Sequence, residues 1–333
     1  MTLLSRRAVL SNALAAMAAP MVIGARRAAA QDAYPARALR MIVPWPPGGV
    51  TDVVARLIAL KLSGELGRTV VVENRPGASG TIGHAAAAQA EPDGYTVLFG
   101  TNSTYAMAPY LLGKLPYDNE SAFAPISLVA RSPHVLCAHP SVPMKDFAGF
   151  LEYVRARQPD GVTFSSAGPG SSGHLATELL MSMANFRMLH IPYRGGGPAL
   201  QALLGGQVQV SFVNLVVAMP LAGDRRMTML GVSATERVPA VPDLPTISEL
   251  GVNGFESSTD IALLVPAGTP EPIIQRLNAA LLVALKSPEI SETMRREGAI
   301  IVGSSPQEFP AYFAKETSKW RDIIVSRGIK EQQ

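Results

Sequence analysis

Apolar residues recur along this chain in two alternating patterns, short runs of strand formers and longer segments with helical spacing. From Val53 to Leu62 they return every three or four positions, which is typical of a helix with one buried face. The run at residues 39–43 is too short for a helix and is followed by prolines and glycines, which is typical of a buried strand. The alternation predicts an α/β fold in which parallel sheets are covered by helices on both faces.

The predicted elements follow one another as strand and helix along the chain. The predicted strands are 39–43, 70–73, 96–100, 135–138, 162–165, 189–192, 208–213, 227–232 and 262–265, and the predicted helices are 52–66, 145–158, 174–185, 273–285 and 306–327. Two further segments, 123–133 and 254–266, are extended and bounded by proline. If both are crossings between domains, the first domain is discontinuous, the second is inserted into it, and a cleft lies at the hinge.

The chain length supports two domains, because about 300 residues exceed what a single core usually serves. We predict that residues 31–131 together with 255–333 form the first lobe and that residues 132–254 form the second. Residues 1–30 are excluded from both.

An export signal is predicted over residues 1–30. Arg6 and Arg7 precede an alanine-rich apolar stretch that ends near Ala30 in an A-x-A cleavage pattern, which is typical of a twin-arginine leader. The alternative is an uncleaved membrane anchor, against which the small residues and Pro20 argue. The mature protein is therefore expected outside the cytoplasm.

The positive charge of the chain belongs to this leader. Removing Arg6, Arg7, Arg26 and Arg27 lowers Lys plus Arg from 29 to 25 against 26 Asp plus Glu, so the net charge falls from +3 to −1. No clustered basic face remains, which excludes a nucleic-acid partner. Cys137 is the single cysteine, so neither an intrachain disulfide nor a cysteine-rich metal site is expected.

Two strand-to-helix junctions near the start of the chain carry the main chemical signal. In the first, Gly48 and Gly49 precede the helix, and in the second, residues 77–80 do so. Backbone amides at a helix mouth without Cβ interference favour an anion. Since parallel strands end at one sheet edge, both loops are expected to converge on a crevice that captures a small carboxylate. Asp52 either caps the first helix or faces this ligand.

Further polar loops follow later strands. Residues 101–104 supply hydroxyl and amide donors after strand 96–100, and Asn214 ends strand 208–213, so both are expected at the same edge. The loop 165–174 contains a formal G-x-G-x-x-G, but no Asp or Glu occurs between Glu178 and Asp224 to bind a ribose. A nicotinamide dinucleotide is therefore rejected, and no cofactor is expected.

Two open alternatives concern reactive side chains. Ser171 or Ser172 with His174 could form a serine hydrolase site, although no G-x-S-x-G elbow or orienting acid accompanies them. The histidines show no spacing that supports a metal. Arg194, in a glycine-rich turn, is either a carboxylate clamp or a solvated surface residue.

Six motifs in order resemble the Bug/TctC family, the extracytoplasmic solute receptors of tripartite tricarboxylate transporters. They are Val43-Pro-Trp-Pro-Pro-Gly-Gly, Glu73-Asn-Arg-Pro-Gly-Ala-Ser-Gly, Pro92-Asp-Gly-Tyr-Thr, Lys114-Leu-Pro-Tyr-Asp, Ser166-Ala-Gly-Pro-Gly-Ser with His174-Leu-Ala, and Leu244-Pro-Thr-Ile-Ser-Glu. The resemblance spans essentially the whole mature chain. The effector lobe of a transcription regulator would share the fold, but the export signal and the missing DNA-binding helix pair exclude it.

The resemblance implies a type II periplasmic binding protein, a Venus-flytrap of two doubly wound lobes around an interlobe cleft. It implies a periplasmic, non-catalytic monomer that binds a small organic acid and presents it to membrane transporter subunits or, as the alternative, to a sensor. The ligand-binding residues it implies, together with those favoured above, are Trp45, Gly48, Gly49, Asp52, Ala78, Ser79, Asn102, Ser103, Ser166, Ser171, Ser172, His174, Asn214 and Asp260.

Two departures from the family pattern affect the expected pocket. Many relatives have Asp where this chain has Val213, and many have Trp where this chain has Asp260. We expect Asp260 to line the cleft and to favour a ligand with a donor or cationic group beside its carboxylate. The alternative is a solvated or arginine-paired residue at the hinge. A buried carboxylate requires a partner in either case.

Overall fold

The structure, a computed structural model, describes residues 34–329 apart from 158, 224 and 327. The predicted export signal and its cleavage site lie outside the described residues. Among these described residues, those from Arg37 onward form one compact unit. None of the helices in the described part combines the length and the apolar character that a membrane span requires.

Ten strands of the described chain are joined by hydrogen bonds, in the order β2-β1-β3-β9-β4-β7-β5-β6 with β8 and β10 beside β4. Their bounds are β1 (Leu39–Val43), β2 (Val70–Asn74), β3 (Thr96–Thr101), β4 (Phe123–Ala138), β5 (Thr163–Ser166), β6 (Leu189–Pro192), β7 (Val210–Asn214), β8 (Thr228–Val232), β9 (Ser258–Pro266) and β10 (Ile300–Ile301). The predicted strands are all present, and several match to within two residues.

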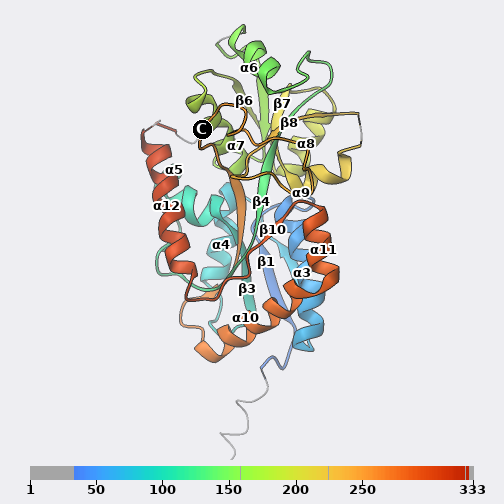
Figure 1. The fold of residues 1–333 in the computed structure, drawn as a ribbon. Helices are drawn as coiled ribbons and strands as arrows, with labels where there is room; N and C mark the ends of the chain where they lie inside the picture. Colours follow the sequence, from blue (N-terminus) through green and yellow to red (C-terminus); the bar gives the residue numbers. More distant parts are fainter. Residues whose placement is uncertain (1–33, 158, 224, 327, 330–333) are drawn as a thin grey trace, which may run out of the picture. The chain divides into compact units, whose positions relative to one another are not determined.

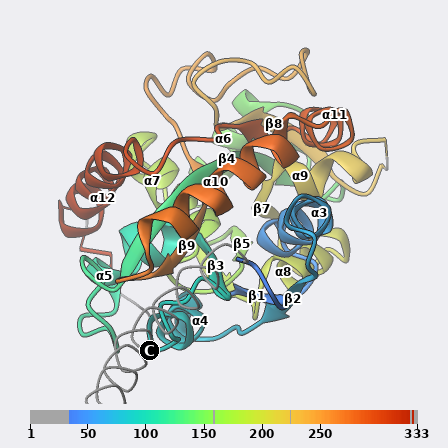
Figure 2. The same cartoon turned by 90° about the horizontal axis from the view of Figure 1, so that it is seen from below.

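The five predicted helices are present as α3 (Val50–Leu66), α6 (Phe147–Arg155), α7 (Ser172–Met183), α10 (Glu271–Lys286) and α12 (Phe309–Ser326). The described residues also form α4 (Thr81–Ala88) and α8 (Gly196–Leu204), together with the shorter α5 (Ala108–Leu111), α9 (Leu215–Ala218) and α11 (Pro288–Arg296). Seen from below, α10 lies over β4, and it packs beside α3 (Figure 2).

The expectation of purely parallel sheets is wrong at the centre of the molecule. The outer pairs are parallel, as in β1 with β2 and β5 with β6, but β9 is antiparallel to both β3 and β4. The reason is that β4 and β9 carry the chain in opposite directions between the two halves. Figure 1 shows β4 running from the lower half into the upper half.

The two crossings are the long strands themselves. The first part of β4, Phe123 to Pro133, pairs with β9, and the last part, His134 to Ala138, pairs with β7 and β8. One sheet is thus shared by two α/β halves, which is the arrangement of a two-lobe type II fold. The lobe boundaries at residues 131 and 255 stay a prediction.

The final helix contributes to both halves. Phe309 of α12 belongs to the apolar cluster around β1, β3 and β9, together with Ile42, Leu98 and Leu264. Near its other end, Trp320 and Ile324 pack into the cluster formed by α6, α7 and their strands. The helix therefore spans the region where the chain crosses between the halves, and its burial of Trp320 links the two cores.

Candidate functional site

The first junction loop, residues 44–49, connects β1 to α3 and is fixed by hydrogen bonds of Trp45. Trp45 is fixed by its indole N–H, which donates to Thr101 Oγ1 at 3.0 Å, and by its carbonyl, which accepts from Asn74 Nδ2 at 3.0 Å. Gly49 is the N-cap of α3 and supplies no side-chain cap. The first turn of α3 therefore offers its N–H groups without a protein side chain in front of them.

The Asp52 side chain stabilises the first junction loop through hydrogen bonds. Its carboxylate accepts hydrogen bonds from Gly48 N at 3.0 Å, from Asn74 Nδ2 at 3.0 Å and from Arg56 Nη2 at 2.9 Å. Burial alone would raise the pKa of Asp52, but these three partners outweigh it and lower the pKa. Both the Gly48 amide and the Asp52 carboxylate therefore have protein partners, and they shape the loop. Neither residue lines any of the three cavities that form where the junction loops meet the second half of the chain.

The second junction loop is wound in a conformation that is costly for residues other than glycine. Ala78 and Ser79 have φ values of 44° and 52°, between Gly77 and Gly80, which also have positive φ. Thr104 Oγ1 donates to the Ser79 carbonyl at 2.9 Å and keeps the loop in place. Ala78 and Ser79 of this strained turn line a cavity, as the sequence of the second junction loop predicts.

Three cavities lie where these loops meet the second half of the chain. Two are narrow, of about 50 Å³ each, and share Gly49, Val50, Ala167, Ser171, Ser172, Gly196 and Asn214 in their linings. The third is wider, about 460 Å³, and is lined by the second junction loop, by residues 167–169 and by residues 193–195. Ala167 lines all three, and Trp45 and Pro46 line one narrow cavity and the wide one. The predicted convergence of the two loops is therefore present.

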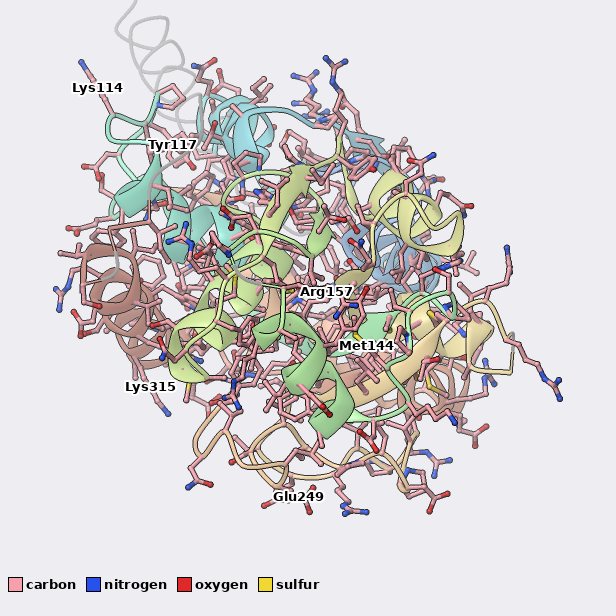
Figure 3. All side chains as sticks on the ribbon, turned by 90° about the horizontal axis from the view of Figure 1, so that it is seen from above. Lys114, Tyr117, Met144, Arg157, Glu249 and Lys315 are labelled. Carbon is pink, nitrogen blue, oxygen red and sulfur yellow. The ribbon has the colours of Figure 1, made fainter. Side chains whose placement is uncertain are left out.

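The two halves touch directly at this place. Ser79 Oγ donates to the Pro169 carbonyl at 2.6 Å, and Ser172 N donates to Ser103 Oγ at 3.0 Å. These contacts explain why the inner cavities are narrow: the structure shows the halves closed on each other. The charged residues Lys114, Glu249 and Lys315 do not take part in this contact. Their side chains project outward at the edges of the molecule when it is seen from above (Figure 3).

A stack of three rings supports the loop 166–170 of the second half. Phe164 stacks on His190 at 4.8 Å between ring centroids, and His190 stacks on His174 at 4.2 Å. His190 Nε2 lies 2.7 Å from Ser166 Oγ, while His174 Nδ1 accepts from Gly170 N at 3.1 Å. His174 is buried and absent from the cavity linings, so it positions the loop instead of facing them.

These imidazoles are neutral near pH 7. Burial lowers the pKa of His190 to about 4, and burial with the nearby His190 ring lowers the pKa of His174 to about 3. Both values lie below the ordinary value of 6.5. The unfolded chain then binds more protons than the folded one, so the stability that the neutral rings provide is complete above about pH 6.5 and is lost as the pH falls toward 4.

One prediction follows for acid unfolding. In His190→Gln, the free energy of unfolding should fall less steeply between pH 6 and pH 4.5, by about 1.4 kcal/mol per pH unit, because one fewer proton is taken up on unfolding. Urea titrations at several pH values measure this slope. Ser166 keeps a hydrogen-bonding neighbour in this variant, and a slope equal to that of the wild type would contradict the prediction.

The hydrolase arrangement is not assembled. Ser171 Oγ caps α7 by accepting from His174 N at 3.4 Å, and the ring nitrogens of His174 face Gly170 and Glu178. Ser172 Oγ instead lies 2.5 Å from Thr259 Oγ1 and 3.2 Å from His134 Nε2. No acidic side chain orients His134 in the described contacts; its other ring nitrogen lies 3.2 Å from Ser257 Oγ.

This second network contains residues that the sequence did not single out. Thr259 lines one narrow cavity, and its hydroxyl accepts from Asn214 Nδ2 at 2.8 Å. His134 is fully buried behind Ser172 and Thr259, and burial lowers the pKa of His134 to about 4. Asn214 lines both narrow cavities, as predicted from its place at a strand end. Ser103 and Ser166 each line one of the two narrow cavities.

Asn102 and Asp260 lie beside the cavities, in a buried charged cluster. Asn102 Nδ2 donates to Glu316 Oε1 of α12 at 3.0 Å. Asp260 is 1% exposed; its carboxylate accepts from Tyr312 OH at 2.8 Å and from Ser258 Oγ, and it lies 3.4 Å from Arg131 Nε. Burial and the neighbouring Glu316 charge raise the pKa of Asp260 to about 6 against the opposing effect of Arg131.

The arginine-paired alternative for Asp260 is therefore the one observed, and the expected position in the cleft is not. The physical reason is the register of the central strands, which places Arg131 of β4 directly opposite Asp260 of β9. Neither Asp260 nor Asn102 lines the cavities, and both connect the cavity region to α12. Among the described residues, no group of three or more His, Cys, Asp and Glu side chains is arranged to hold a metal ion.

Similarity to known proteins agrees with this geometry. Residues 54–329 match the model of the tripartite tricarboxylate transporter family receptor. The chain is 36% identical to the protein BugT of Bordetella pertussis over 300 residues, which cover 90% of this chain and 92% of BugT.

Solved structures are similar as well. An R. palustris protein determined with adipate has a TM-score of 0.86 at 33% identity, covering 89% of this chain and 99% of that one. MatC from Rhodopseudomonas palustris, determined with bound malate, has a TM-score of 0.82 at 35% identity, covering 87% of this chain and all of MatC. With the two-lobe fold, the facing junction loops and the family match, the chain belongs to the receptors of the tripartite tricarboxylate transporter family.

Proposed function

We propose that this protein captures a small carboxylated organic solute outside the cytoplasm and presents it to a tripartite tricarboxylate-type transporter. The observation that carries the proposal is the uncapped start of α3 at Gly49 and Val50, which faces Ser171 and Ser172 across two narrow cavities. Backbone N–H groups and hydroxyls at a helix mouth suit a carboxylate. No acidic side chain lines these cavities to repel it.

The comparisons support the class of solute. Two similar proteins, each at least 33% identical to this chain, were determined with adipate and with malate, which are both small dicarboxylates. We propose the same general class here. The residues that we assign to contact the solute are Trp45, Gly49, Ala78, Ser79, Ser103, Ser166, Ser171, Ser172 and Asn214. Gly48, Asp52, Asn102, His174 and Asp260 are assigned a supporting role, because none of them lines the three cavities and each is held by protein partners.

The remaining parts of the proposal follow from the family and the sequence. We propose a periplasmic monomer whose leader is removed near Ala30, with the first lobe made of residues 31–131 and 255–333 and the second of 132–254. Transport subunits in the membrane are the proposed partner. Closure of the lobes around the solute would create the form that this partner binds.

Titration calorimetry with a panel of organic acids tests the function. We expect at least one small carboxylate to bind with a dissociation constant in the micromolar range or below, and the corresponding amide or alcohol to bind at least about 100-fold more weakly. Mass spectrometry of solute released from the protein as purified guides the choice of panel. Equal binding of an acid and its uncharged amide would contradict the proposal.

The proposal also excludes hydrolysis, which gives a separate prediction. The wild-type protein should turn over p-nitrophenyl acetate no faster than Ser171→Ala or Ser172→Ala, because neither hydroxyl is hydrogen-bonded to a base that an acid orients. The measurement is the release of p-nitrophenol at pH 7.5. Turnover that both substitutions abolish would favour the hydrolase alternative.

A further inference from the structure

The linings of the three cavities contain one ionised side chain, Arg194. Every other residue that lines them is apolar, a glycine or a neutral polar residue. Arg194 lies in the wide cavity of about 460 Å³, together with the second junction loop. No hydrogen bond or ion pair to the Arg194 guanidinium occurs among the described residues. A cation without a carboxylate partner therefore lies beside the proposed solute site.

The backbone on each side of Arg194 is fixed. Tyr193 N donates to the Ser166 carbonyl at 3.0 Å, and Gly195 N donates to the Ala167 carbonyl at 3.2 Å. Both bonds tie the turn to the loop that lines the narrow cavities. The position of the Arg194 Cα relative to these cavities is thus set by the protein, although the side chain itself is exposed.

The same turn meets the first half of the chain. Gly195 has a φ of +117°, and a Cβ atom on it would lie 2.9 Å from Pro46 Cγ. Glycine is therefore required both by the backbone conformation and by the close approach to the first junction loop. When the halves are closed, as here, Arg194 is held next to their contact, at the wide cavity that also contains Ala78 and Ser79.

The walls between the narrow cavities and Arg194 suit a methylene spacer. Trp45 and Pro46 line both a narrow cavity and the wide one, and Pro76 and Pro169 add apolar surface to the latter. A solute whose first carboxylate lies at the mouth of α3 could extend along these walls. Its far end would then reach the region of the one cation in the lining.

We infer that Arg194 binds a second carboxylate at the far end of the solute, so that the preferred ligand is an extended dicarboxylate. This inference rests on the proposed function and adds the distal site to it. A guanidinium can pair with a carboxylate through two parallel hydrogen bonds, and an uncharged lining leaves this pairing without competition from a protein carboxylate. Because Arg194 is exposed, we expect a moderate contribution to affinity.

The test compares linear dicarboxylates from succinate to suberate with monocarboxylates of equal carbon number, for example adipate with hexanoate. Calorimetry should show that wild type binds its best dicarboxylate at least about tenfold more tightly than the matched monocarboxylate. Arg194→Gln should remove this preference and leave monocarboxylate affinity unchanged within about twofold. Arg194→Lys should retain part of the preference, because the charge remains and the planar fork is lost. Arg295→Gln, an exposed arginine on α11, is the control and should behave as wild type.

The outcomes separate the two proposals. A dicarboxylate preference that persists in Arg194→Gln, or equal binding of diacids and monoacids by wild type, overturns the role of Arg194 while the receptor function stands. Absence of binding for every acid in the series by the wild type overturns the inference for these solutes and also counts against the proposed function. Thermal melting of each variant checks that the substitution leaves the fold intact.

Discussion

Arg131→Met is expected to lower the free energy of unfolding at pH 8 by about 2–3 kcal/mol, because it removes the cation beside the buried Asp260 carboxylate. The loss is smaller than for a fully buried ion pair, because the Arg131 side chain is 35% exposed and is partly screened by solvent. Asp260 lies 3.4 Å from Arg131 Nε and is 1% exposed, and Glu316 of α12 is also buried. Without Arg131, two carboxylates share the region where the chain crosses between the halves. Urea unfolding followed by circular dichroism measures the loss.

The pH dependence distinguishes this cause from simple loss of packing. Burial and Glu316 already raise the pKa of Asp260 to about 6, and loss of Arg131 should raise this pKa further. The folded state of the variant then holds a proton that the unfolded state releases, so its stability falls as the pH rises above about 4. The deficit of Arg131→Met should be smaller at pH 5 than at pH 8.

A second substitution controls for the missing side chain. Asp260→Asn keeps the shape of Asp260 and removes its charge, so Arg131→Met with Asp260→Asn should be more stable at pH 8 than Arg131→Met alone. If the double variant is less stable than the single one, repulsion between buried carboxylates does not explain the effect. The coupling between the two sites is read from the double-mutant cycle.

Ala167→Trp is expected to weaken solute binding by about 100-fold or more, which corresponds to about 3 kcal/mol. Ala167 lines all three cavities and is half-buried, so a large ring there would fill the space between the junction loops and the second half. The measurement is calorimetric titration with the tightest acid of the panel.

The control for this substitution is Ala314→Trp, since Ala314 is exposed on α12 and lines none of the cavities. It should bind like wild type. Both variants should retain cooperative thermal unfolding, since Ala167 lies in a loop with room beside it. If Ala167→Trp binds the acid with wild-type affinity, the solute does not lie in these cavities.

The strands and loops whose form depends on neighbouring residues in the sequence were predicted correctly. The strand Leu39–Val43 is an apolar run followed by prolines, and the strand Leu189–Pro192 is followed by a glycine-rich turn, and the predicted bounds of both strands match the structure. The junction loops were also predicted, because glycines before a helix permit positive φ and leave the backbone amides without Cβ interference. The position of Asn214 at the cavities was predicted because Asn214 ends a strand.

The central antiparallel pairing was missed for a physical reason. Pro125 and Pro133 interrupt the pattern of β4, and proline normally argues against a continuous strand. The structure accommodates Pro125 next to an irregularity in the register with β9. Strand direction within a shared sheet depends on how the chain crosses between halves, which periodicity does not encode.

Contacts between residues that lie far apart in the sequence were also not predicted. The Ser172 hydroxyl is held by Thr259 and His134, which lie 87 and 38 positions away in the chain. Likewise, Asp260 faces Arg131 because β4 and β9 pair in a particular register. Each residue was visible in the sequence, but its partner was fixed only by the fold. A prediction of the β4 and β9 pairing would have identified the ion pair.

The central claim is that a carboxylate is held by backbone amides at the start of α3 and the second junction loop, between the two halves. A crystal structure of the protein with its co-purified or tightest acid tests this most directly. The account predicts a carboxylate oxygen within about 3.2 Å of backbone nitrogens at residues 49–51 or 77–80, with Ser171 or Ser172 on the opposite side. A solute bound elsewhere, or bound there through an uncharged group with its carboxylate in solvent, would contradict the account.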